Sequence, residues 1–120
     1  MKEIKRKLTF AELTVQSYQI GEEYCIHVSG GDRPHIGCVV LASPRPSLRD
    51  AGAVSATSSV LNVVGHQDEH ICRLLAEAAA KKMNAVTVCT GGFHVDGITE
   101  EQIQELMDCV NKLAKELSYF

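Results

Sequence analysis

A single strand-like segment, residues 85–90, stands between the two helical segments of this chain, which are residues 66–83 and a segment that starts at Thr99. A sheet of repeated βαβ units needs strands and helices in regular alternation, so this order excludes a Rossmann-type arrangement. Four strand-like segments precede the first helix: residues 8–20, 24–28, 36–42 and 54–64. We therefore expect an α+β fold: an antiparallel-rich sheet of about five strands with two helices on one face, in the order ββββαβα.

The two helices have recognisable faces and ends. Ile71 and Leu75 stand four apart in the first helix and predict a buried stripe, and Asn84 suits its C-terminal turn. In the second helix, Thr99 is a good N-cap, and Gln102 three residues later completes a capping box. The capping box is the clearest start signal in the sequence.

The bulk composition is that of one globular domain covering residues 1–120, with 45% apolar and 22% charged residues. A net charge of −3 argues against nucleic-acid binding by broad phosphate neutralisation. The basic cluster of Lys2, Lys5, Arg6 and Lys7 fits a solvated terminal strand. No segment approaches the ~20 apolar residues that span a bilayer, so we expect no membrane partner.

Five cysteines, an odd number with no C-x-x-C pair, indicate neither a zinc ribbon nor a disulfide scaffold. Cys25, Cys38 and Cys89 fall in strand-like segments and are expected to be inert, buried thiols in a reducing compartment. The charged N-terminus has no apolar core after it, so it does not resemble a signal peptide. The expected location is the cytoplasm.

The segment 29–37 is the first candidate site. Gly30 and Gly31 permit positive φ and can turn backbone N–H groups toward an anion, with Asp32, Arg33 and His35 beside them. The alternative is an ordinary turn between strands, with Asp32 as a turn residue.

A second candidate follows in Arg45, Ser47 and Arg49, where Pro44 and Pro46 stiffen the chain around Arg45. Arginine presents a planar fork of donors suited to a carboxylate or phosphate. The alternative is an exposed loop with solvated arginines. The hydroxyl-rich stretch after this loop offers hydrogen bonds to a phosphate or a ring edge, although it also fits the entry to an edge strand; its candidate residues are Ser55, Thr57 and Ser58.

Two histidine pairs complete the candidates. His66 and His70 stand four apart, but Gln67 occupies the place of the glutamate in the metalloprotease pattern, so no metal site is expected. His94 and Asp96 are polar pocket candidates, and a general base with its orienting partner is the weaker alternative. The chain contains no G-x-S-x-G, P-loop or G-x-G-x-x-G motif, so no complete catalytic set is found and no catalytic residue is assigned.

Taken together, these motifs resemble the LpdD-like prenylated-flavin chaperones that accompany UbiD-type decarboxylases. The resemblance spans about residues 28–105 and rests on the segments 30–37, 44–47, 55–60, 65–66 and 92–96, in that order. That family is similar in fold to the proteasome assembly chaperones, small α+β proteins that often pair as dimers.

The resemblance implies a non-catalytic protein that holds prenylated FMN or FMN, or loads it into an apo-decarboxylase of the UbiD type, as a homodimer or higher homo-oligomer. The arginines would face the flavin phosphate, the hydroxyl-rich stretch would add hydrogen bonds, and His35 and His94 with Asp96 would address the ring edge. This requires Arg45, Arg49 and the glycine pair to converge on one ligand. The alternatives are an interaction module without a small ligand and a small enzyme that uses His94, His35 and Asp96.

Overall fold

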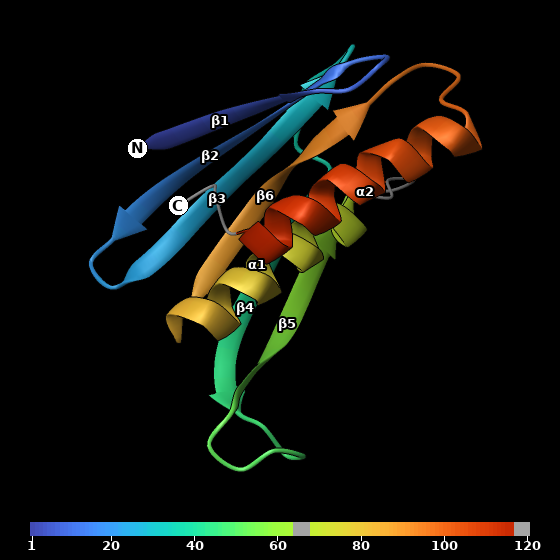
Figure 1. Ribbon diagram of the computed structural model, residues 1–120. Helices are drawn as coiled ribbons and strands as arrows, with labels where there is room; N and C mark the ends of the chain where they lie inside the picture. The colour runs from blue at the N-terminus through green and yellow to red at the C-terminus, as the bar shows by residue number, and fades with distance from the viewer. Residues whose placement is uncertain (64–67, 117–120) are drawn as a thin grey trace.

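The computed structural model describes residues 1–63 and 68–116, which form six strands and two helices (Figure 1). The strands are β1 (Lys2–Lys7), β2 (Glu12–Ile20), β3 (Glu23–Gly31), β4 (Cys38–Pro46), β5 (Val54–Asn62) and β6 (Thr87–His94). Helix α1 (Glu69–Met83) joins β5 to β6, and α2 (Glu100–Glu116) follows β6. The predicted α+β class is confirmed, with one strand more than expected, because the basic terminal segment pairs with β2 as an edge strand.

One sheet contains all six strands in the order β1-β2-β3-β6-β4-β5. Every neighbouring pair is antiparallel except β3 and β6, which run parallel. The chain leaves the sheet at its β5 edge, crosses through α1, and inserts β6 between β3 and β4 (Figure 1). The one parallel pair therefore lies in the middle of the sheet, where both of its strands have neighbours.

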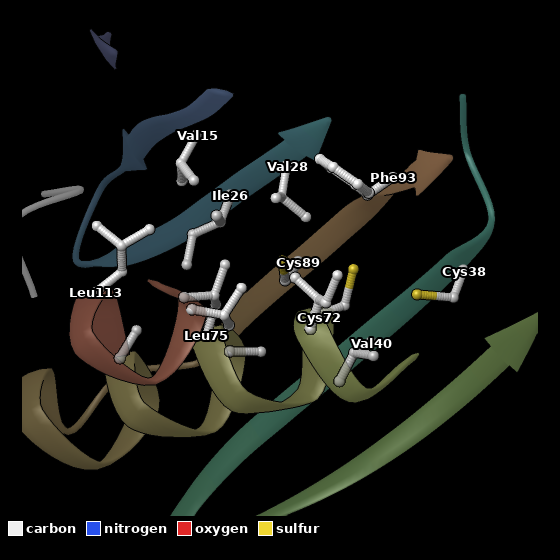
Figure 2. Close-up of a cluster of buried hydrophobic side chains, with 14 of the residues drawn as sticks. Val15, Ile26, Val28, Cys38, Val40, Cys72, Leu75, Cys89, Phe93 and Leu113 are labelled. Atoms are coloured by element: carbon white, nitrogen blue, oxygen red, sulfur yellow. The ribbon is translucent and has the colours of Figure 1, made fainter. Parts of the chain in front are cut away.

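Both helices cover the same face of the sheet, as expected (Figure 1). Alternate residues of β2 and β3 point under the helices, so Val15 and Ile26 are buried while their neighbours are not. Leu75 of α1 and Leu113 of α2 cover the core from the helix side of the sheet (Figure 2). Neither helix of the described residues is long and apolar enough to cross a membrane.

The ends of both helices follow the sequence signals. The N–H of Thr99 donates to Oε1 of Gln102 over 2.9 Å, and the N–H of Gln102 donates to Oγ1 of Thr99 over 3.1 Å, which is the predicted capping box. Asn84 ends α1 in the left-handed conformation, with φ of 49°. The start predicted for α1 at residue 66 lies outside the described residues.

Strand β4 is longer than predicted, because Pro44 does not end it. The strand continues to Pro46, opposite Val54 of β5. Its pairing with β6 stops at Ala42, so neither proline lies opposite a β6 residue that would need its missing N–H. The end of the β4–β5 hairpin consequently extends past β6 without a second neighbour (Figure 1).

The cysteines pack as small hydrophobic residues. Cys38, Cys72 and Cys89 are buried together where α1 crosses β4 and β6 (Figure 2). Burial raises the pKa of the Cys38 thiol, and the hydrogen bond with Cys89, followed by burial, raises the pKa of Cys72. The Cys38 and Cys72 thiols stay protonated at neutral pH, which fits the expectation of an inert thiol at Cys38, whereas Cys25, also expected to be buried, is half-buried.

Candidate functional site

The glycine pair belongs to β3 and not to a loop. Gly30 pairs with Phe93, and Gly31 pairs with His94 of the parallel strand β6. A Cβ on Gly31, whose φ is +80°, would overlap the backbone of His94, and a Cβ on Gly30 would overlap the carbonyl oxygen of Glu12. The N–H of Asp32 donates to the carbonyl of His94 over 2.7 Å. The glycines therefore allow β3 and β6 to pack closely. The prediction that backbone N–H groups here point toward an anion is wrong for the Asp32 N–H, which is already bonded to His94.

Asp68 joins three parts of the fold at the same end of the sheet. It directly precedes α1, but its side chain makes no capping bond, and only 6% of that side chain is exposed. Oδ1 accepts the N–H of Phe93 over 2.9 Å, and Oδ2 lies 3.1 Å from Nε2 of His35. Asp68 thereby ties the start of α1 to β6 and to the segment between β3 and β4.

His35 fits between Asp68 and the neighbouring backbone. Its Nδ1 lies 2.8 Å from the carbonyl oxygen of Arg33, while its Nε2 faces the Asp68 carboxylate. Both partners are acceptors, so whichever ring nitrogen carries a proton has an oxygen to donate to. A Cβ on Gly37 would overlap Asp68, and a Cβ on Gly92 would crowd the His35 ring. The absence of a side chain at Gly37 and Gly92 leaves the space that Asp68 and His35 occupy.

His94, Asp96 and Arg33 form a second, more exposed group beside the first. Nε2 of His94 donates to Oδ1 of Asp96 over 2.8 Å, and Nη2 of Arg33 lies 3.5 Å from Oδ2. The His94 hydrogen bond, followed by the Arg33 charge, lowers the pKa of Asp96 below its ordinary value. The His35 and His94 rings meet edge to face, with centroids 6.3 Å apart. The two groups therefore form one continuous polar cluster, and it contains His35, Arg33, Asp68, His94 and Asp96.

A groove of about 670 Å³ opens from this cluster between the two helices. Asp68 and His94 form its polar end, and His70, Arg73 and Glu77 of α1 line one wall. The rest is apolar; its lining comprises Ile71, Leu74, Phe93, Val95, Ile98, Ile103, Leu106 and Met107. A mostly apolar hollow of this size with a few polar groups at one end is the usual form of a small-molecule site. We name this hollow the interhelical groove.

The predicted site residues fall into two separate groups. Gly30, Gly31, Asp32, Arg33, His35, His94 and Asp96 gather at the groove end of the sheet. Arg45 stands seven residues after Cys38, which is about 23 Å along β4 from that end. Arg49 lies still farther along the chain, in the turn of the β4–β5 hairpin, where the hydroxyl of Ser47 accepts its backbone N–H over 3.2 Å. The expected convergence of Arg45, Arg49 and the glycine pair on one ligand is therefore wrong for a single copy of the chain.

The hydroxyl-rich stretch does not gather around one ligand either. Thr57 accepts a hydrogen bond from Nε of Arg45 over 2.8 Å, and Ser55 lies opposite Arg45 in the register. Ser58 points the other way, toward the helices, and donates to Glu77 over 2.9 Å. Successive residues of a strand point to opposite faces of the sheet, so Ser58 cannot share a ligand with Thr57 there.

His66, the remaining candidate, lies outside the described residues. Among those that the structure describes, no cluster of three or more His, Cys, Asp or Glu side chains is arranged to hold a metal. The sequence analysis missed Asp68 and Arg73 as site residues. The sequence did not mark Asp68 as a site residue, because a carboxylate just before a helix is usually explained by its favourable interaction with the helix dipole.

The comparisons with known proteins identify a family. The sequence model of the family described as "Prenylated flavin chaperone LpdD-like domain" matches residues 9–119. No curated protein matches the sequence significantly. A chain of a yeast 20S proteasome assembly chaperone complex is similar in structure, with a TM-score of 0.49 and 15% sequence identity, over 97% of this chain and 93% of that chain.

Proposed function

Because the chain belongs to the family of LpdD-like prenylated flavin chaperones, its role is that of a chaperone and not of an enzyme, and we propose that it binds prenylated FMN in the interhelical groove. The groove supports this proposal because it is mostly apolar, as a flavin ring requires, and has hydrogen-bonding groups at one end. His94 and Asp96 are the residues that we assign to the polar edge of the ring.

The flavin phosphate needs a cationic partner, and two arginines stand near the groove: Arg73 lines it, and Arg33 pairs with Asp96 next to the lining residue His94. Arg33 lies beside Asp96, and Arg73 of α1 lies 3.0 Å from Glu69. Each guanidinium is held by a carboxylate yet stays partly exposed, with 70% of the Arg33 side chain and 42% of the Arg73 side chain accessible. Partial exposure leaves donors for a phosphate, which arginine binds through paired hydrogen bonds. We assign the phosphate to these two residues in place of Arg45 and Arg49.

An Ile103→Glu substitution tests the location of the flavin. Ile103 lines the groove from α2 and is 38% exposed, so a charged side chain is tolerated there but fills the hollow and repels the phosphate. We expect FMN or prenylated FMN to bind at least about tenfold more weakly, which corresponds to about 1.4 kcal/mol, in a fluorescence titration. Gln104→Glu is the matched control, because it adds the same charge next to Ile103 outside the groove lining. Equal loss of affinity in both variants would contradict the assignment.

We further propose that the chaperone delivers its flavin to an apo-decarboxylase of the UbiD type. Loaded chaperone mixed with such an apo-decarboxylase is expected to restore decarboxylation faster than the same amount of free prenylated FMN. Ile103→Glu protein given the same flavin should provide no advantage over free flavin. If the wild-type chaperone also gives no advantage while it binds the flavin tightly, the delivery step is wrong and the binding site is unaffected.

A further inference from the structure

The two edges of the sheet differ sharply in composition. Strand β1 has the sequence KEIKRK, so every residue except Ile4 is charged. Strand β5 has the sequence VSATSSVLN, which contains no charged residue and no proline over nine positions. Proteins commonly protect exposed edges with charges, prolines or bulges, because an open edge invites another strand to pair. By this criterion β1 is protected and β5 is not.

The hydrogen bonds that flank the β4–β5 ladder show which backbone groups of β5 point outward. The N–H of Ser47 donates to the carbonyl of Ala53 over 2.9 Å, and the N–H of Val63 donates to the carbonyl of Gly37 over 2.8 Å. Both pairs continue the register of the ladder. Hydrogen-bonded pairs alternate with non-hydrogen-bonded pairs, so the odd-numbered residues of β5 bond to β4. The N–H and C=O groups of its even-numbered residues therefore point outward, and no described strand pairs with them.

We propose that β5 pairs antiparallel with β5 of a second copy of this chain, around a two-fold axis that passes through Ser58. In this register Ala56 of one copy lies opposite Val60 of the other, and Thr57 lies opposite Ser59. Even-numbered residues then face even-numbered residues, so all of the outward backbone groups find partners. The two sheets become one continuous sheet of twelve strands, twice the six that each copy contains.

A second copy fits this edge better than an unrelated partner. A two-fold contact requires a strand that is complementary to itself, and β5 can be centred on Ser58 with all nine residues paired. Its threonine and serine side chains meet one another across the axis, which is a favourable cross-strand pairing. With no charged residue on β5, no like charges meet there. The side chains of Ala56 and Val60 pack against the core of their own copy, so pairing at the edge leaves each core intact.

Proline substitutions test which of the two sheet edges forms the dimer. Ala56→Pro removes an outward N–H and leaves the bonds from odd-numbered residues to β4 in place, so the dimer is expected to dissociate at least about tenfold more readily in light scattering after size exclusion. Lys5→Pro is the matched control. The bond from Leu8 to Ala11 continues the β1–β2 register, so the N–H of Lys5 also points outward, but from the β1 edge. This variant should remain as dimeric as the wild type.

Cross-linking fixes the register and covers the case in which Ala56→Pro fails to fold. In a hydrogen-bonded antiparallel pair the Cα atoms are about 5.5 Å apart, which is within disulfide range. Ser58→Cys should therefore form a covalent dimer on mild oxidation. Ser55→Cys should not, because residue 55 of one copy lies opposite residue 61 of the other, about 20 Å from its own equivalent. A monomer at about 100 µM, or a dimer with no Ser58→Cys cross-link, would overturn the proposal. Neither outcome depends on flavin binding.

Discussion

Replacing Gly91 with alanine is expected to lower the free energy of unfolding by at least about 3 kcal/mol, a large part of the stability of a small domain. Gly91 has a φ of +141°, which alanine rarely adopts, and an added Cβ would overlap the carbonyl oxygen of Val28. Val28 belongs to β3, which is fixed between β2 and β6, so its backbone cannot move aside. Backbone strain and overpacking each cost about 1–3 kcal/mol.

Gly97→Ala is the matched control for this substitution, measured by urea denaturation of both proteins. Gly97 also has a positive φ, +65°, but nothing lies within 4 Å of the position of a Cβ. Its replacement carries the conformational cost alone, about 1–2 kcal/mol. If both variants lose the same free energy of unfolding, the backbone of Val28 does not lie as close to Gly91 as the structure shows.

Removing the Asp68 carboxylate has the second large expected effect. Asp68→Ala leaves the Phe93 N–H without its acceptor and takes a carboxylate away from His35. A buried N–H that loses its acceptor costs about 1–3 kcal/mol, and the contact between the carboxylate and Nε2 of His35 is lost as well. We expect a fall of about this size in the free energy of unfolding, measured by urea denaturation at pH 7.

Asp68→Asn distinguishes the two roles of this side chain. An asparagine oxygen can still accept the Phe93 N–H, so this variant should keep part of the stability that Asp68→Ala loses. Its amide nitrogen, however, replaces the oxygen that faces Nε2 of His35, so the stability that is still lost reports on that contact. An Asp68→Ala protein as stable as the wild type would show that Asp68 does not hold α1, β6 and His35 together.

The sequence was a good guide where a local signal decides the structure. Thr99 and Gln102 gave the start of α2, and alternation in β2 and β3 gave their buried faces, because capping and burial act over a few neighbouring residues. The sequence was a poor guide to Pro44. Whether a proline ends a strand depends on whether a neighbouring strand needs its N–H, and that neighbour, β6, is far away in the chain.

The candidate site shows the same limit. Segments around residues 30–35 and 94–96 were both predicted as sites, and they meet because β3 and β6 are parallel neighbours. Arg45 seemed to belong with them because it is close in sequence, but an extended strand carries it to the other end of the sheet. The groove itself needed two helices to be placed against each other, and no motif marks that arrangement.

The account depends on one claim: the interhelical groove, with Asp68 and His94 at its polar end and with His35 and Asp96 beside them, holds the flavin. The most direct measurement is the absorbance spectrum of the protein purified from cells that make prenylated FMN, recorded for the wild type and for Ile103→Glu. We expect flavin absorbance with the wild type and with Gln104→Glu, and little with Ile103→Glu. A colourless wild-type protein that also fails to bind flavin at millimolar concentration, or an Ile103→Glu protein as yellow as the wild type, would contradict the claim.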